Sequence, residues 1–333
     1  MLGYAYTQHL PGSSWGMTVH LHDAKAFDLT PISKPSSRTP LAPSHSRFRT
    51  LFCFMLASQV FVRIACFGTF LLLGGLTFSL AAEPEPIEPA QKIDLLADGL
   101  TPFYTWLQDT RREDPRRVFR IHDGVLHITG DGLGCITSHQ SFRNYHLIAE
   151  FKFGEKTFGE RAEKAKDSGI LVHSFGEDGA YNGIWMRSFE AQVIEGGCGD
   201  FIVVRGAVPN AAELALTAEV KPGPNNQWIW QAGGERREFP RGRVNWFGRD
   251  PNWKDERGFR GKHDVESPSG EWTRMEVICD GATITVLVNG TIVNRAFDCR
   301  PSAGRIQIQT ELAEIDYRKL ELWPLGKAPS FKD

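Results

Sequence analysis

The chain has 333 residues, with 38 Lys and Arg against 40 Asp and Glu and a net charge of -2. Because there is no excess of basic side chains to neutralise phosphates, this balance argues against nucleic acid as a main partner. The 33 glycines, 22 phenylalanines and 9 tryptophans are typical of an all-β domain with many turns and an aromatic-lined cleft.

The N-terminal part of the chain predicts an export signal. Residues 1–54 are rich in Ser, Pro and His without periodicity, which indicates an over-extended gene start or a disordered arm. Residues 55–82 are expected to form a secretory signal peptide, because Ser79-Leu80-Ala81 supplies small residues for cleavage after an apolar run. That run, residues 64–82, is also long enough to span a bilayer, so a membrane anchor is the alternative to a periplasmic or secreted protein.

Beyond an acidic, Pro-rich linker at residues 83–92, residues 93–325 predict one domain of short strands. Asn289-Gly290 between alternating apolar runs is a strong signal for a β-hairpin. Residues 211–220 are the best candidate for a short helix, and residues 221–270 predict a long loop. Short strands separated by turns favour an all-β, jelly-roll sandwich of two sheets. The expected strands cover residues 125–128, 146–153, 168–173, 274–279, 283–288, 291–293, 305–309 and 317–323.

The exported part of the chain keeps four cysteines, and an exported protein tolerates disulfides. Cys279 and Cys299 flank a predicted hairpin, so these two could pair. Four cysteines allow three connectivities, and the sequence does not choose among them. The spacings match no zinc pattern. The four residues are Cys135, Cys198, Cys279 and Cys299.

The segment Glu190-Ala191-Gln192-Val193-Ile194-Glu195 carries the first candidate chemistry. Side chains alternate faces along a strand, so Glu190 and Gln192 share one face. A bulge of one residue, a feature common next to active sites, would bring Glu195 to the same face as Glu190. The two carboxyl groups would then resemble the acid pairs of glycosidases. The alternative is a solvated strand face whose opposite face is buried.

Other polar and aromatic side chains are candidates for the same site. His173 ends one predicted strand, and Trp185 and Arg187 precede Glu190. Aromatic rings beside carboxylates suit sugars, since pyranose faces stack on rings while acids and amides bind hydroxyls. Each also has a plainer interpretation: His173 as a strand-end histidine, Arg187 as an ion-pair partner of Glu190, and Trp246 as a pin for the long loop. The loop acids Asp264 and Glu266 equally suit a solvated surface. The substrate-binding candidates are Gln192, Arg187, Trp185, Trp246, Asp264, Glu266, Gln309 and Glu311.

Five short segments occur in an order and spacing that resemble the 3-keto-disaccharide hydrolase family. The resemblance covers roughly residues 93–324. It implies a concanavalin A-like jelly roll, related in fold to laminarinases and lectins. The segments are Asp167-Ser168-Gly169-Ile170, Phe189-Glu190-Ala191-Gln192-Val193-Ile194-Glu195, Gly270-Glu271-Trp272-Thr273, Val288-Asn289-Gly290 and Ile306-Gln307-Ile308-Gln309.

The laminarinase-type glucanases use a similar Glu-x-Asp-x-x-Glu strand, whereas this sequence has Gln192 at the position of their Asp. Because glutamine does not titrate, this difference argues against the ordinary retaining mechanism. For a 3-keto sugar the resemblance implies another route, in which a base removes the acidified C2 proton, the C1 leaving group departs and water adds back. Glu190 is then cast as base or metal ligand and Glu195 as general acid or its partner, with His173 as a third catalytic candidate. His173 and Arg187, or a divalent cation, would polarise the keto oxygen.

The leading interpretation is therefore an exported enzyme that cleaves 3-keto-glycosides or related oligosaccharides. A non-catalytic, lectin-like carbohydrate-binding module is the alternative, because the same sandwich serves both purposes. An ordinary glucan hydrolase is a third possibility, weakened by Gln192. An ion pair between Arg187 and Glu190 would favour the binding module, whereas perturbed carboxyl pKa values at one site would favour an enzyme.

Overall fold

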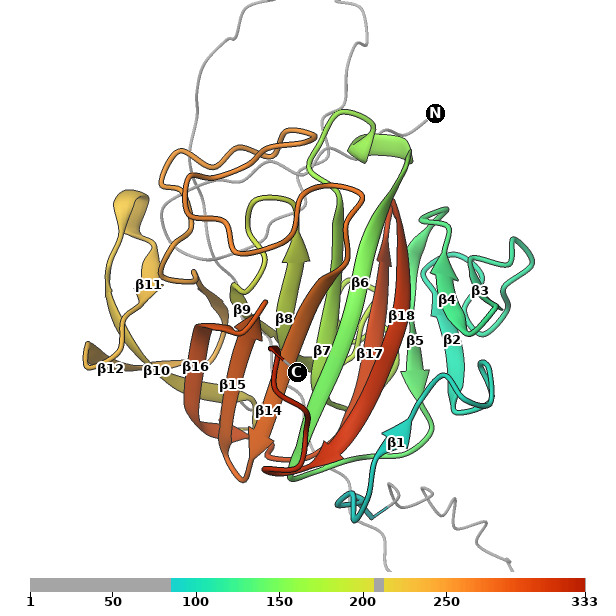
Figure 1. The fold of residues 1–333 in the computed structure, drawn as a ribbon, viewed down its shortest axis with the longest axis horizontal. Coiled ribbons are helices and arrows are strands. Elements are labelled where there is room, and N and C mark those ends of the chain that lie inside the picture. The colour runs from blue at the N-terminus through green and yellow to red at the C-terminus, as the bar shows by residue number, and fades with distance from the viewer. Residues whose placement is uncertain (1–84, 207–212, 333) are drawn as a thin grey trace, which may run out of the picture. The chain divides into compact units, whose positions relative to one another are not determined.

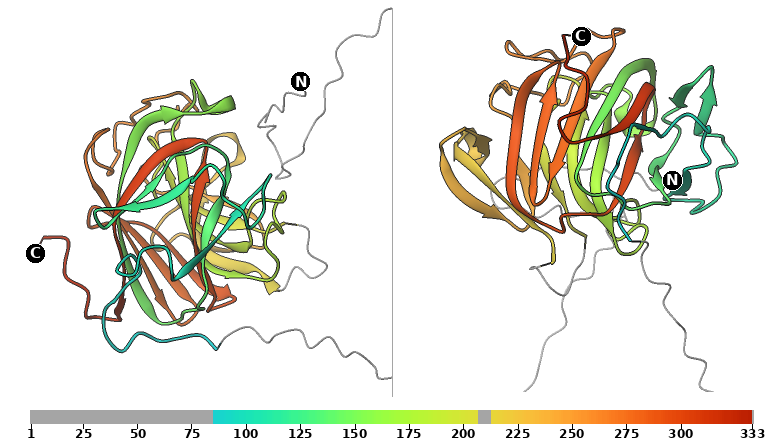
Figure 2. Two further views of the ribbon diagram at one scale, coloured as in Figure 1. Left: turned by 90° about the vertical axis from the view of Figure 1, so that its right-hand side faces the viewer. Right: turned by 60° about the horizontal axis from the view of Figure 1, so that its bottom comes forward.

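The computed structural model describes residues 85–206 and 213–332, which form two β-sheets packed face to face (Figure 1; Figure 2). The predicted N-terminal arm and signal peptide lie outside these residues. The helical turns described are η1 (Gly159–Arg161) and η3 (Pro224–Asn226). Within the described ranges, no helix has the length and apolar character needed to cross a membrane.

In the described residues, the smaller sheet has seven antiparallel strands and carries the candidate chemistry. In the view of Figure 1, its strands β8, β7 and β17 lie behind strands of the larger sheet. The spatial order is β13 (Gly242–Val244), β9 (Phe201–Val204), β8 (Arg187–Ile194), β7 (Asp167–Phe175), β17 (Arg305–Glu311), β5 (Leu133–Ser138) and β2 (Phe103–Leu107).

The larger sheet has eleven strands in the described part of the chain. Nine follow one path, while β1 (Ile93–Asp94) pairs with β18 and β12 (Glu235–Phe239) pairs with β10. The path runs β11 (Trp228–Trp230), β10 (Ala215–Pro222), β16 (Thr291–Arg300), β15 (Thr283–Val288), β14 (Thr273–Asp280), β6 (Tyr145–Thr157), β18 (Ala313–Pro324), β4 (Val125–Ile128) and β3 (Phe119–His122).

Alternating side chains explain the two layers. On β8, Phe189, Ala191 and Val193 enter the core between the sheets, so Glu190 and Gln192 face outward from the sandwich. The neighbouring strands contribute to the same core, which joins both sheets in one hydrophobic cluster. The predicted all-β, two-sheet jelly roll is therefore confirmed.

The predicted hairpin at Asn289-Gly290 is confirmed. β15 pairs with β16, and both turn residues have positive φ, 47° and 76°, as a tight hairpin turn requires. The C-terminal segment crosses the outer face of the larger sheet near this turn, where Arg274 donates to the carbonyl oxygens of Pro329 and Ser330 (Figure 1). Phe331 lies over Gly290.

Two predictions for the middle of the chain are wrong. Of the predicted helix at residues 211–220, residues 211 and 212 lie outside the described ranges, and residues 215–220 belong to strand β10 (Ala215–Pro222), which pairs with β11, β12 and β16. Ala, Leu and Glu favour helices locally, but pairing with three strands and burial of alternate side chains override that preference. The predicted loop at residues 221–270 contains three short strands, β11 to β13, and is irregular mainly after Asn245.

The predicted pairing of Cys279 with Cys299 is not present, because all four cysteines of the described residues are free and buried. Burial raises the pKa of the Cys135 thiol to about 12, and it does the same for Cys279. These side chains therefore behave as small core residues rather than as reactive thiols.

Candidate active site

The outer face of the smaller sheet holds a group of polar side chains on three adjacent strands. Leu171 on β7 pairs with Glu190 on β8, and Gly169 pairs with Gln192. Ile308 on β17 pairs with Ile170, so the next residue, Gln309, comes opposite Gly169. We call this group the polar cluster; it consists of Arg161, Asp167, Gly169, Glu190, Gln192, Arg243, Gln309 and Glu311.

Gly169 allows two of these side chains to approach each other. A Cβ at this position would lie 2.5 Å from Glu190 Oε1 and closer still to Gln309 Oε1. Real Cβ atoms do not make such contacts, so any larger residue at 169 would displace both side chains. The glycine hydrogen is what leaves room for a carboxyl group and an amide on the two sides of β7.

Glu190 is a buried carboxyl group, 5% exposed, that forms no hydrogen bond or ion pair within the described residues. Burial raises its pKa well above the usual range, and repulsion from Glu311 and Asp167 adds to the shift, while Arg243 opposes it. Glu190 therefore keeps its proton to a higher pH than an ordinary glutamate does. A neutral carboxyl group that holds a transferable proton is suited to general acid catalysis.

Arg161 links the other two acids of the cluster. Its guanidinium group donates to Asp167, lies 3.4 Å from Glu311 Oε1 and lies 3.3 Å from Asp255 Oδ1. Burial and the neighbouring Asp167 raise the pKa of Glu311 to about 8, against the opposing effect of Arg161. Burial also raises the pKa of Asp167, which Arg161 opposes. Two acids and one arginine thus form a single ion-paired group.

Arg243, on β13, brings a second positive charge to the cluster. Its guanidinium lies 3.3 Å from Asp200 Oδ2 and donates to Gln192 Oε1 at 3.4 Å. The Gln192 amide in turn donates to Asp167 Oδ1 at 2.5 Å. Both ends of the Gln192 amide therefore have protein partners, and this residue positions Asp167 relative to Arg243 instead of presenting a free amide.

Gln309 is the unsatisfied member of the cluster. Its side chain is 0% exposed, and neither its amide nitrogen nor its amide oxygen has a hydrogen-bond partner. Leaving a buried amide unpaired costs roughly 1–3 kcal/mol, so such a group calls for an explanation. Hydrogen bonds to a bound ligand beside Glu190 would satisfy both atoms.

An apolar patch covers the next part of the same outer face. Trp185 packs with Leu171, Cys135 and Val204, and its indole nitrogen donates to Gly134 O at 3.1 Å. Trp185 was a predicted sugar-binding residue, but it is 7% exposed and reaches across the sheet as part of this patch. It borders the polar cluster through Leu171, the pairing partner of Glu190.

The predicted bulge that would place Glu195 beside Glu190 is wrong. β8 runs without a register shift from Phe189 to Ile194 and ends there. The Glu195 carboxylate accepts hydrogen bonds from the backbone N–H groups of Lys166 at 2.9 Å and Gly258 at 3.0 Å. It therefore ties two loops to the end of the strand, and the structure does not bring it into the polar cluster.

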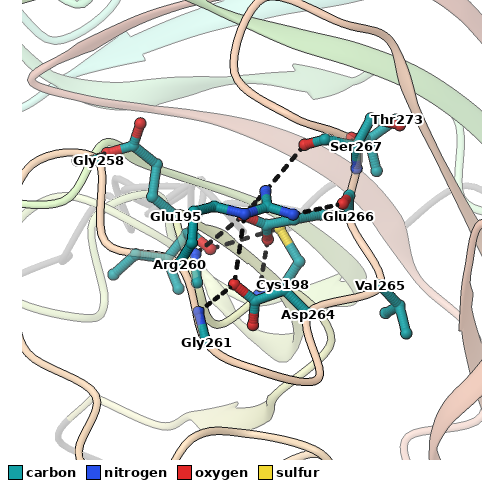
Figure 3. A network of polar contacts seen from close by, with 12 residues as sticks. Glu195, Cys198, Gly258, Arg260, Gly261, Asp264, Val265, Glu266, Ser267 and Thr273 are labelled. Atoms are coloured by element: carbon teal, nitrogen blue, oxygen red, sulfur yellow. Dashed lines mark hydrogen bonds and ion pairs between the residues drawn. The ribbon is translucent and has the colours of Figure 1, made fainter.

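The loop acids belong to a separate network at that strand end (Figure 3). Arg260 lies between Asp264, 3.6 Å from its Oδ2, and Glu266, 3.1 Å from its Oε1. Glu266 also accepts from the backbone N–H groups of Gly196 and Cys198. A pocket of about 140 Å³ adjoins this network and Glu195 but has no polar-cluster residue in its lining. Because these carboxylates hold backbone and Arg260 groups, they fix the loop in place.

Three further predicted site residues lie away from the cluster. His173 is fully buried against the rings of Tyr145 and Phe189, its Nδ1 lies 3.1 Å from Pro301 O, and burial lowers its pKa to about 4. Trp246 is 1% exposed and belongs to the core. Arg187 stacks over Phe175 and has no ion pair with Glu190 in the described ranges.

Sequence reasoning missed Arg161, Asp167, Gly169 and Arg243 as members of the site. Asp167 and Gly169 lie in one of the family segments, and pairing of the two strands places them opposite Ile194 and Gln192, on the strand of Glu190. Arg161 comes from a charged loop and Arg243 from a short edge strand. No local pattern distinguishes these two from surface arginines, because their roles depend on loops that fold back over the sheet.

The expected divalent cation would need several free oxygen ligands at the site. No group of three or more His, Cys, Asp and Glu side chains in residues 85–206 and 213–332 is arranged to hold a metal ion. In the polar cluster, Arg161 contacts two of the three acids, and burial favours a proton on the third. These residues do not fit a cation, since hard cations need free carboxylate oxygens.

The sequence matches the model of one protein family over most of its length. The model of the 3-keto-alpha-glucoside-1,2-lyase-like domain matches residues 94–322, a range that includes the whole polar cluster. The chain belongs to this family. Members of the 3-keto-alpha-glucoside-1,2-lyase-like family are carbohydrate-active, glycosyl hydrolase-like domains, so the predicted family is confirmed.

Solved structures with a similar fold accompany this family match. One is a proposed glycosyl hydrolase from Parabacteroides distasonis, 17% identical, with 71% of this chain and 100% of that chain covered and a TM-score of 0.40. Another is a protein with a galectin-like fold from Bacillus subtilis, 12% identical, covering 72% and 97%, with a TM-score of 0.39. A third is the β-glucanase of Bacillus licheniformis, 8% identical, covering 71% and 99%, with a TM-score of 0.36. No curated protein matches the sequence significantly.

Proposed function

We propose that this chain is an exported enzyme that breaks the glycosidic bond of 3-keto-glycosides by elimination followed by hydration. The observation that carries the proposal is the pair of Glu190 and Gln309 across Gly169: a buried, proton-holding carboxyl group beside an amide that has no protein partner. The family match supports carbohydrate chemistry at this site. Export rests on the signal-peptide pattern of residues 55–82.

The reaction needs one base and one acid. The C3 ketone acidifies the proton on C2, and a base removes that proton. The electron pair of the C2–H bond forms a C1=C2 double bond as the C1–O bond breaks, and its electrons go to the leaving oxygen. That oxygen takes a proton from the acid and leaves as an alcohol. Water then adds to C1 and a proton returns to C2, so the sum is hydrolysis.

The polar cluster contains groups for these steps. Glu190 carries its proton in the resting site and donates it to the leaving oxygen. The Gln309 amide, which has both a donor and an acceptor free, binds hydroxyl or keto oxygens of the sugar. Arg243, 25% exposed and close enough to Glu190 to affect its pKa, supplies positive charge for the enolate.

A carbohydrate-binding module without catalysis is the second candidate. The unpaired Gln309 amide favours it equally, because a hydroxyl group of a bound sugar would satisfy the amide without any bond being broken. The missing ion pair between Arg187 and Glu190 favours the enzyme, since Glu190 is not neutralised by a permanent partner. The two candidates therefore differ in whether the proton of Glu190 is used.

The test is release of sugar from defined substrates. The purified protein is incubated with trehalose, a β-linked disaccharide and the 3-keto form of each, with and without chelator. We expect release from the keto forms alone, a loss of at least about 100-fold in Glu190→Gln, and no effect of chelator. Release from the unoxidised sugars would identify an ordinary glycosidase. Saturable binding without release from any sugar would identify the binding module.

A further inference from the structure

We propose that Glu311 is the base that removes the C2 proton, with Glu190 as the acid and Arg161 as the residue that positions Glu311. The inference rests on the proposed function and assigns its second carboxyl group. It replaces Glu195, which the sequence pattern suggested as the partner of Glu190.

Strand pairing places Glu311 on the same face as Glu190. Gln309 lies opposite Gly169, and Glu311 follows two residues later on β17, so its side chain points outward as well. Of the charges around Glu190, Glu311 raises its pKa most, which requires the two carboxyl groups to be close in space. Gly169 lies on the strand between them and leaves the space above β7 free of a side chain.

Glu311 differs from the other acids in its access to solvent. Its side chain is 20% exposed, whereas that of Asp167 is 5% exposed and held by Arg161 and Gln192. A base that accepts a proton in each turnover must pass it on, and partial exposure provides the route to water. Asp167 lacks that route, and Glu195 is held by the backbone N–H groups of Lys166 and Gly258.

Arg161 keeps Glu311 in a usable state. Its guanidinium contacts Glu311 Oε1 at 3.4 Å and so favours the carboxylate form, which burial and Asp167 oppose. Burial and Asp167 still raise the pKa of Glu311 to about 8, so the carboxylate is available mainly at mildly alkaline pH. Glu190, by contrast, has no cation in ion-pair contact among the described residues, and burial followed by repulsion from the neighbouring acids raises its pKa. The contact with Arg161 therefore favours Glu311 as the base, and the absence of such a contact favours Glu190 as the acid.

In this assignment the proton balance closes within the site. Glu311 takes the C2 proton and becomes neutral, while Glu190 gives its proton to the leaving oxygen and becomes a carboxylate. During hydration the roles reverse: the Glu190 carboxylate takes a proton from the water that adds to C1, and Glu311 returns one to C2. Both carboxyl groups then regain their starting states, and no oxidant, reductant or further reactant is needed.

Deuterium exchange separates the two carboxyl groups. In D₂O, removal and return of the C2 proton replaces it with deuterium even when the glycosidic bond does not break. Incorporation at C2 of a 3-keto-glucoside is followed by NMR, with C4 of the same molecule and an enzyme-free blank as controls. The variants are Glu311→Gln, Glu311→Asp, Glu190→Gln and, as a matched control outside the cluster, Glu195→Gln, each checked for folding by thermal melting.

We expect Glu190→Gln to keep exchange at C2 while losing cleavage, and Glu311→Gln to lose both by at least about 100-fold. Glu311→Asp should recover part of the exchange, and Glu195→Gln should keep it. The assignment would be overturned if Glu311→Gln exchanged C2 within about threefold of the parent rate. It would also be overturned if Glu190→Gln lost exchange while Glu311→Gln kept it. A parent protein with neither exchange nor cleavage would contradict the proposed function instead.

The pH profile of the parent gives a check that does not depend on a variant. The exchange rate at low substrate should rise with pH and level off with a midpoint near 8, where Glu311 loses its proton. A midpoint near 4.5, the ordinary value for a glutamate, would overturn the assignment of Glu311.

Discussion

Replacing Gly169 with alanine tests the central geometry of the site. The added Cβ would lie 2.5 Å from Glu190 Oε1 and closer still to Gln309 Oε1, so both side chains must move. The backbone itself accepts alanine, because φ at this position is not positive. Since both side chains are buried, little free space is available to receive them. The substitution therefore disturbs the site without removing any of its functional groups.

The expected effects are large for activity and moderate for stability. Overpacking typically costs about 1–3 kcal/mol, which corresponds to a fall of roughly 2–10 °C in Tm for a domain of this size. A displacement of about 1 Å in catalytic groups can reduce the rate roughly 100-fold, so we expect kcat/KM on a 3-keto-disaccharide to fall by that factor. Initial rates of sugar release and thermal melting measure the two effects.

Gly154→Ala is the matched control. A Cβ at 154 would also meet a carboxylate side chain, 2.5 Å from Glu314 Cγ, but on the larger sheet. We expect a similar fall in Tm and unchanged kcat/KM. If Gly169→Ala instead keeps both the melting temperature and the activity of the parent, Glu190 and Gln309 do not meet across this glycine and the site is incorrectly described.

Three more predictions follow from buried titratable groups. Folded Glu190 holds its proton to a higher pH than the unfolded chain does. The parent should therefore lose stability relative to Glu190→Gln as pH rises above about 4.5, and the difference between the two should stay constant below that pH. Urea unfolding from pH 4 to 9 measures this, and parallel curves over the whole range would contradict the raised pKa. His173 is buried in its neutral form with a pKa of about 4, so the free energy of unfolding should rise by roughly 3 kcal/mol between pH 4 and 6.5. The variant His173→Asn should flatten that rise and keep the activity. Lost activity in a folded His173→Asn variant would show that His173 takes part in the reaction. Thiol labelling with peptide mapping should modify the four cysteines of residues 85–332 only after unfolding, whereas a pair protected in both states would indicate a disulfide.

The fold was predictable because local patterns and tertiary structure agree along most strands. Alternating apolar and polar residues on β6 and β8 predict strands, and Asn289-Gly290 predicts a hairpin turn. The structure has both features. The helix prediction is wrong for residues 215–220 because their helix-favouring composition conflicts with pairing to neighbouring strands, which a local stretch of sequence does not show.

The site was predictable only in part, for a different reason. Glu190 and Gln309 follow from strand alternation and from the family segments. The partner acid does not, because choosing Glu311 over Glu195 requires the order of β8, β7 and β17 in space. Arg161 reaches the same point from a loop, and only the folded chain shows that contact.

The C-terminal segment has a practical consequence for how the protein can be handled. Arg274 and the Asn289-Gly290 turn hold residues 329–331 against the outer face of the larger sheet, whereas the polar cluster lies on the outer face of the other sheet. Immobilisation on a sensor surface through the C-terminus would therefore turn the cluster toward the solution. A C-terminal tether thus suits saccharide titrations on a chip, with the sheet sandwich itself acting as the spacer.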